Sequence, residues 1–153
     1  MNRIAELLPE SNVAVGLDAA TKRDLFASVA ALFESSGGLA RQVVVDALAA
    51  REKLGSTGLG QGIAIPHGRI RGLKDARGAF VRLAQPIPFD APDGRPVNQV
   101  FVLLVPEQAT EQHLELLSEL AQMFSERGFR ERIASAADAT ATWAAIRGWT
   151  PAA

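Results

Sequence analysis

The chain has 153 residues, 48% hydrophobic and 22% charged, a balance typical of one soluble globular domain and unlike that of a disordered or collagen-like chain. With 16 basic and 17 acidic side chains the net charge is −1, which gives no electrostatic reason to bind nucleic acid. The absence of cysteine excludes disulfides, thiolate catalysis and sulfur-rich metal sites. We therefore expect residues 1–153 to form a single domain in the cytoplasm.

The chain begins with a strand-like segment and a helix-like segment. Residues 12–17 alternate short apolar and small side chains, as a strand does. Thr21 and Asp24 then stand at the spacing of a capping box, and an apolar stripe follows them. The pair Gly37-Gly38 provides a left-handed stop. This pattern predicts a helix over 21–36.

A second helical pattern leads into a glycine-rich stretch. It covers 39–54 and places on one face Val44, Ala47, Leu48 and Arg51. Residues 55–62 contain too many glycines for a regular element, so we predict a loop there. A short strand is predicted over 63–65. Pro66 ends it, and His67 follows in a glycine-bearing turn.

The second half of the chain predicts strands followed by helices. Val, Phe and Leu fill two strand candidates, 79–83 and 97–105, and proline and glycine mark the turn between them. The apolar run of the second strand is too short to span a bilayer, so we expect no membrane insertion. Thr110 is the predicted cap of a helix, and further helical segments cover 129–133 and 137–146. The inward stripe of the helix after Thr110 is predicted to be His113, Leu117, Leu120, Ala121 and Phe124. The fold class is therefore α/β, a single domain with a mixed sheet flanked by helices.

Proton or phosphoryl chemistry near neutral pH has few candidates, because the chain has two histidines and no tyrosine. His67 would stand at the rim of the sheet, where a turn presents its ring. The same place suits an ordinary solvated loop histidine. His113 would lie in the first turn of its helix, beside free backbone amides that form an anion site and disfavour a protonated ring. A buried histidine satisfied by the backbone is the alternative.

Arg51 is the third candidate, because helical spacing places it on the inward face of its helix. Its planar guanidinium suits a phosphoryl group, although its stem could also extend from the helix end to solvent. The glycines of 55–62 match neither the dinucleotide nor the P-loop pattern. We expect no cofactor, and no metal site, because no third nitrogen or sulfur ligand is evident. The basic run that follows His67 is usually a solvated face, but it could attract a phosphorylated donor; it comprises Arg69, Arg71, Lys74 and Arg77.

Three sequence blocks together resemble one known family. They are REKLGSTGLGQGIAIPHG at 51–68, FDAPDG at 89–94 and LVPEQATEQHL at 104–114. The first strongly resembles the active-site segment of the fructose/mannitol/nitrogen class of IIA domains of the bacterial phosphotransferase system. Gln61 departs from the family pattern, in which Asn is frequent, and this concerns the geometry of the loop.

The resemblance implies that His67 accepts a phosphoryl group at Nε2 from the phosphocarrier HPr or its nitrogen-branch relative. It implies that His113 and Arg51 stabilise the phosphoryl oxygens. The free-standing length and the Leu103–Pro106 run resemble the nitrogen-regulatory branch, whose members act on partners such as potassium transporters or sensor kinases. A sugar-specific IIA that passes phosphate to a IIB domain is the alternative, and a binding module that has lost phosphorylation is a third.

Overall fold

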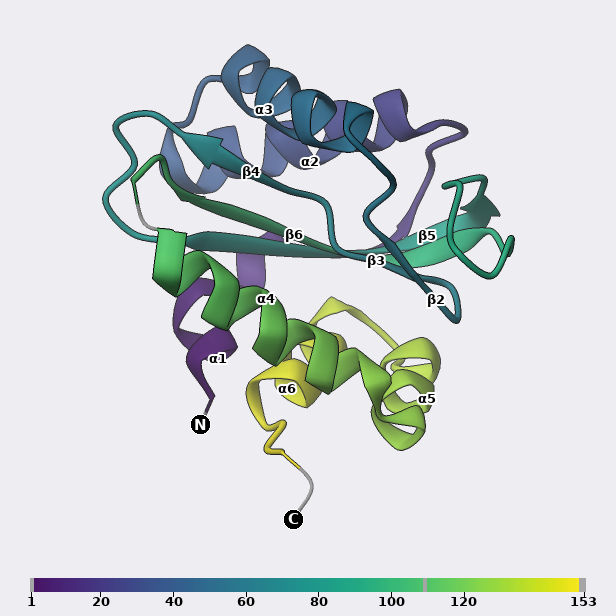
Figure 1. The fold of residues 1–153 in the computed structure, drawn as a ribbon. Helices are drawn as coiled ribbons and strands as arrows, with labels where there is room; N and C mark the ends of the chain where they lie inside the picture. The colour runs from purple at the N-terminus through teal and green to yellow at the C-terminus, as the bar shows by residue number, and fades with distance from the viewer. Residues whose placement is uncertain (1, 109, 152–153) are drawn as a thin grey trace.

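The computed structural model describes residues 2–108 and 110–151 and is built on one six-stranded sheet (Figure 1). Its strands are β1 (Val13–Leu17), β2 (Gly58–Gly60), β3 (Ile63–Ala64), β4 (His67–Ile70), β5 (Arg77–Ile87) and β6 (Val97–Pro106). The order is β1-β5-β6-β3-β2, and β4 also pairs with β6. Both parallel and antiparallel pairs occur, so the sheet is mixed.

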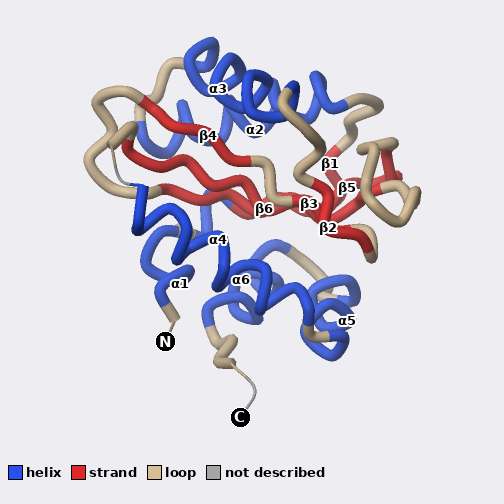
Figure 2. The backbone as a smooth tube through the Cα atoms, viewed as in Figure 1, coloured by secondary structure: helices blue, strands red, loops and turns tan. Residues whose placement is uncertain are grey.

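Helices cover both faces of the sheet. They are α1 (Arg3–Leu7), α2 (Lys22–Gly37), α3 (Arg41–Lys53), α4 (Thr110–Ser125), α5 (Arg127–Ser135) and α6 (Ala139–Arg147). One face carries α2 and α3, and the other carries α1, α4, α5 and α6 (Figure 2). The predicted fold class, a mixed sheet flanked by helices, is confirmed. Within the described residues, no helix has both the length and the apolar character needed to cross a bilayer.

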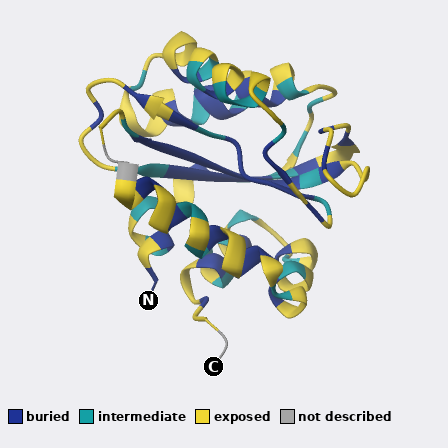
Figure 3. Cartoon of the chain, viewed as in Figure 1, coloured by how far each residue is buried: buried dark blue, intermediate teal, exposed yellow. Residues whose placement is uncertain are grey.

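The middle of the sheet is β6, as the apolar run from Val100 to Val105 predicts. Its side chains alternate between two cores. Val100 and Val102 pack with α2 and α3, whereas Phe101 and Leu103 pack with the helices of the opposite face. Figure 3 shows the strands mostly buried and the outer sides of the helices exposed. Because β6 is buried on both faces, its register is fixed. The positions of the strands that pair with it, β3, β4 and β5, are fixed along with it.

Two helix predictions differ in how far the structure supports them. The Thr21 side chain accepts a hydrogen bond from the Asp24 backbone amide, and Gly38 ends the same helix at φ 72°, so both signals of α2 are confirmed. The stripe predicted for α4 is partly wrong, because Ala121 is exposed while Leu116 and Met123 are buried. The face of α4 that packs on the sheet is therefore rotated from the predicted one, so that it includes Leu116 and Met123 and excludes Ala121. The Thr110 side chain lies outside the described residues, as does its predicted capping role.

The loop predicted over 55–62 contains a strand. Residues 58–60 form β2, which pairs antiparallel with β3. The connection is a tight hairpin in which Gln61 has φ 59° and Gly62 has φ 79°. Two successive positive φ values are those of a type I′ turn, the connection that matches strand twist. Glycine content therefore marked a hairpin here instead of an irregular loop.

Gln61 occupies a left-handed position that glutamine adopts reluctantly, at a cost of roughly 1–2 kcal/mol for an L-residue. Asparagine tolerates this region better. We expect Gln61→Asn to raise the free energy of unfolding by about 0.5–1 kcal/mol in urea denaturation. Gln85→Asn, at an exposed site of β5, is the matched control and should bring no gain. Equal changes in the two variants would contradict a backbone origin.

Candidate functional site

His67 stands where the edge of the sheet is interrupted. The strands β3 and β4 pair in turn with the same side of β6, with Ile63 opposite Gln99 and His67 opposite Leu103. Between them Pro66 has no amide hydrogen, but its carbonyl accepts a hydrogen bond of 3.0 Å from the Leu103 amide. The predicted glycine-bearing turn after Pro66 is therefore wrong, because the ladder resumes and His67 begins a new strand.

Gly68 determines which way this strand faces. A Cβ atom added to Gly68 would lie 3.0 Å from the Cβ of Ala47, so the backbone of β4 packs directly against α3. Successive side chains of a strand point to opposite faces. His67 and Arg69 accordingly lie on the face away from α3. There the imidazole of His67 meets α4.

A backbone carbonyl determines the tautomer of His67. The Nδ1 atom lies 2.9 Å from the carbonyl oxygen of Ile65, and a carbonyl only accepts hydrogen bonds, so Nδ1 carries the proton. In the neutral ring the lone pair is then on Nε2. Burial lowers the pKa of His67 below its usual value, and the nearby charge of Arg51 adds to this, partly offset by the Ile65 hydrogen bond. The neutral, nucleophilic form is therefore favoured.

His113 lies beside this ring. The two ring centroids are 5.2 Å apart with the planes at 85°, an edge-to-face arrangement. His113 is 8% exposed, and its Nδ1 is buried with no hydrogen-bond partner among the described residues. Its pKa is lowered mainly by burial, and further by His67, Arg69 and Arg51. The separation satisfies the requirement, set by hydrogen-bond lengths of roughly 3 Å, that the two rings reach one group between them.

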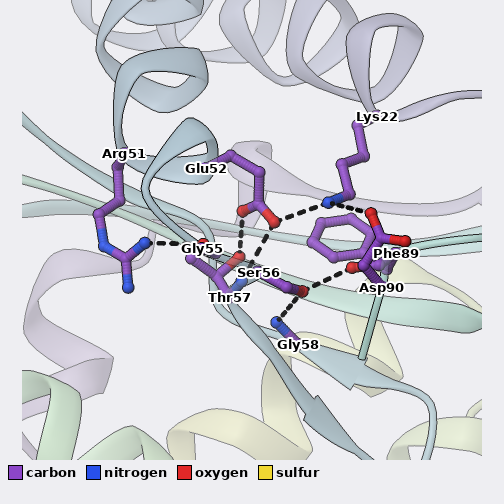
Figure 4. Close-up of polar contacts among 9 residues, drawn as sticks. All are labelled: Lys22, Arg51, Glu52, Gly55, Ser56, Thr57, Gly58, Phe89 and Asp90. Carbon is purple, nitrogen blue, oxygen red and sulfur yellow. Dashed lines mark hydrogen bonds and ion pairs between the residues drawn. The ribbon is translucent and has the colours of Figure 1, made fainter. Parts of the chain in front are cut away.

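Arg51 approaches the same place from α3. Its Nη1 donates a 2.8 Å hydrogen bond to the carbonyl oxygen of Gly55, which holds the side chain at the end of the helix (Figure 4). Its positive charge lowers the pKa of both histidines, so it lies within electrostatic reach of each. The residue is half-buried and not fully extended to solvent. The structure thus packs His113 against His67 and places Arg51 within electrostatic reach of both rings.

The basic run after His67 divides in two. Arg69 is exposed, contributes to the low pKa of His113 and donates a 3.4 Å hydrogen bond to the Glu107 carbonyl. Arg71 and Lys74 are exposed. Arg77, in contrast, donates to the carbonyl of Gly37 and ties β5 to the end of α2. Only the first member of the run therefore belongs to the electrostatics of this site.

Sequence reasoning missed a polar network behind the site. Figure 4 shows the carboxylate of Glu52 pointing toward Thr57 and Lys22, away from the neighbouring Arg51. Glu52 is adjacent to a candidate residue in the sequence, which is the only local signal. Lys22 is far away on α2, and no spacing rule connects it with Glu52.

The arrangement suits an anion with several oxygens. A neutral ring offers a lone pair at Nε2, a second ring adjoins it, and a permanently charged guanidinium is close by. Such a set can attack a phosphorus atom and neutralise the charge of its oxygens. Among the described residues, no group of three or more histidine, aspartate or glutamate side chains could hold a metal ion.

Comparisons with known proteins agree with this chemistry. Residues 6–148 match the family described as phosphoenolpyruvate-dependent sugar phosphotransferase system, EIIA 2. The nitrogen regulatory protein of Pseudomonas aeruginosa is 42% identical, over 94% of each chain. The crystal structure of nitrogen regulatory protein IIA-Ntr from Neisseria meningitidis has 48% identity and a TM-score of 0.89, over 95% of this chain and 99% of that chain. IIA mannitol from Escherichia coli, at 22% identity and a TM-score of 0.74 over 90% of this chain and 97% of that chain, shares the fold.

Proposed function

Because the chain belongs to the EIIA type-2 family of the phosphoenolpyruvate-dependent sugar phosphotransferase system, we propose that it carries a phosphoryl group on Nε2 of His67. The observation that supports this most is the hydrogen bond from Nδ1 to the Ile65 carbonyl. It leaves the lone pair of the neutral ring on Nε2, in a ring that packs edge-to-face with that of His113. A carrier needs such a nucleophile, held in one tautomer and ready for attack.

The proposed step exchanges one phosphorus–nitrogen bond for another. The Nε2 lone pair of His67 attacks the phosphorus of a phosphohistidine on the donor, an HPr-type phosphocarrier. The new bond forms as the donor bond breaks, and the bonding pair returns to the donor ring. Nδ1 of His67 keeps its proton throughout, and the Ile65 carbonyl stabilises the positive charge that the phosphorylated ring acquires. No general base is required.

His113 and Arg51 have the supporting roles in this proposal. The phosphoryl group in transit carries its charge on its oxygens, so preorganised donors lower the barrier. Arg51 supplies a permanent charge and a planar fork. His113, kept neutral by burial, supplies one N–H donor without adding a competing cation that would have to be desolvated. The two helpers come from α3 and α4, on opposite sides of the sheet.

We propose a regulatory output as the biological role. The relatives at 42% and 48% identity are nitrogen regulatory proteins, and they match nearly the whole length of this chain. The proposed partners are a phosphocarrier of the nitrogen branch and, in the cytoplasm, proteins such as potassium transporters or sensor kinases. Transfer to a IIB domain in fructose or hexitol transport is the alternative. It is favoured by the 30% identity, over 88% of this chain, to the fructose-specific EIIABC component of Bacillus subtilis.

Reconstitution tests this function directly. Incubation with enzyme I, a phosphocarrier and phosphoenolpyruvate should produce one acid-labile phosphate per chain, found by mass spectrometry. Failure with both the HPr-type and the nitrogen-branch phosphocarrier would leave only the binding-module hypothesis. Rapid onward transfer to a purified IIB domain would instead favour transport. A pull-down that compares wild type with His67→Ala and a charged mimic would identify partners that distinguish the two states.

A further inference from the structure

Glu52 is a buried carboxylate that satisfies several donors at once. Its side chain is 7% exposed. One oxygen accepts a 2.6 Å hydrogen bond from the Thr57 hydroxyl, and the other accepts from the Thr57 amide at 3.1 Å and from Lys22 Nζ at 2.8 Å. A carboxylate in this position is costly unless its oxygens are fully used. Here three donors share them, and two belong to a single residue of the loop (Figure 4).

Thr57 continues the hydrogen bonds to the phosphorylatable ring. Its carbonyl accepts a 3.0 Å hydrogen bond from the Ile65 amide, and the Ile65 carbonyl accepts from Nδ1 of His67 at 2.9 Å. The amide and carbonyl of Ile65 flank its α-carbon. The hydrogen bond from the Ile65 amide to Thr57 therefore influences the direction of the Ile65 carbonyl, which accepts the hydrogen bond from His67. The order is therefore Glu52, Thr57, Ile65, His67.

We propose that Glu52 is a positioning residue that acts through Thr57 and Ile65 to hold His67 in the tautomer whose Nε2 is free. This rests on the proposed function, in which that nitrogen accepts the phosphoryl group. Glu52 touches neither ring. It holds Thr57, and Thr57 in turn holds Ile65, whose carbonyl orients the ring of His67. Outer hydrogen-bond partners orient metal-bound histidines in the same way. Arg51 holds the same loop at Gly55, so neighbouring residues of α3 serve the site in two ways.

The charge of Glu52 also changes the pKa of His67, and the direction of this change helps to separate an electrostatic role of Glu52 from its positioning role. Its negative charge raises the pKa of His67, against the larger effect of burial. Removing the charge would therefore lower the pKa and increase the neutral, reactive fraction. Slower phosphoryl transfer in a Glu52 variant cannot come from protonation of the ring. In a folded variant, slower transfer would therefore point to the orientation or tautomer of His67.

The test uses Glu52→Gln and Thr57→Val in the full-length chain. Glutamine replaces one acceptor oxygen by an N–H₂ donor that faces other donors, and valine removes the hydroxyl while keeping the side-chain shape. We expect nitrogen NMR shifts of His67 to report a mixture of tautomers instead of one. The maximal rate of phosphate uptake should fall about 10- to 100-fold, the range found for outer partners of metal-bound histidines. The half-saturating phosphocarrier concentration should stay unchanged.

Three further variants separate positioning from stability. Thr57→Ser restores the hydroxyl and should restore both the tautomer and the rate. Lys22→Met removes the ion pairs with Glu52 and Asp90 but leaves both hydrogen bonds from Thr57 to Glu52, so it should lower stability and keep the tautomer. Glu34→Gln is the matched control, because Glu34 also forms an ion pair between α2 and α3, with Arg41, but is exposed and remote from Thr57. It should match wild type in both readouts.

The outcomes distinguish this inference from the function on which it rests. A folded Glu52→Gln protein with the wild-type tautomer and rate would overturn the positioning role. If that variant does not fold, the Thr57→Val and Thr57→Ser pair decides, and equal behaviour of the two would overturn it as well. The NMR comparison needs no phosphate. A wild-type protein that fails to take up phosphate would therefore refute the carrier function while leaving the tautomer test valid.

Discussion

His67→Ala is expected to abolish phosphate uptake completely. The reason is that Nε2 of His67 is the nucleophile in the proposed step, whereas His113 is assigned only hydrogen-bond donation. The neighbouring ring, 5.2 Å away, is the natural competitor, because a second imidazole could in principle accept the group. Mass spectrometry under conditions that preserve acid-labile phosphate gives the answer, and peptide mapping identifies the site.

The control for this variant is the retained fold. His67 begins a strand and contributes a half-buried ring, so alanine leaves the β4–β6 ladder intact. Amide NMR spectra should show changes confined to the surroundings of the ring. Phosphate found on His113 in this variant would show that the two histidines had been assigned the wrong way round.

His113→Ala is expected to accept phosphate about 10² to 10³ times more slowly than wild type, the usual cost of losing one preorganised donor. Arg51→Lys should fall in the same partial class, because a point charge does not reproduce the guanidinium fork. Both should still reach one phosphate on His67 after long incubation. Single-turnover kinetics at equal donor concentration measure the effect.

Two controls match these substitutions. Leu114→Ala changes the exposed neighbour of His113 on the same helix, and Arg41→Lys makes the same exchange at the exposed start of α3. Both side chains are exposed, so unchanged chemistry is expected at saturating donor. A His113→Ala protein that is folded but as inert as His67→Ala would contradict the division between nucleophile and helper.

The parts of this molecule that depend on local rules could be predicted from the sequence. Thr21 and Gly38 bound α2 because capping depends on a few consecutive residues. The apolar run of β6 indicated a central strand for a similar reason. His67, His113 and Arg51 were identified because each is a residue type rare in the chain or oddly placed on its element. Their convergence follows from the sheet, not from any one segment.

The parts that depend on contacts between distant segments could not be predicted in the same way. Pairing with β3 makes a strand of Gly58–Gly60, although glycine alone disfavours one. The ladder of β6 extends past Pro66 and places His67 in a strand. The proposed role of Glu52 depends on its hydrogen bonds with Lys22 and Thr57, which approach it only in the folded chain. Sequence spacing along α3 carries no trace of these partners.

The hydrogen bond between His67 Nδ1 and the Ile65 carbonyl has a thermodynamic consequence for the proposed carrier. In the proposed carrier the same contact would serve the free and the phosphorylated ring, so transfer in and transfer out would follow one path in opposite directions. Because one phosphoramidate replaces another, little free energy is dissipated at the exchange. The fraction of this protein that is phosphorylated then follows the phosphorylated fraction of its donor. A carrier of this kind would report how much of its donor is phosphorylated. It would lose its phosphoryl group by the reverse transfer when that fraction falls.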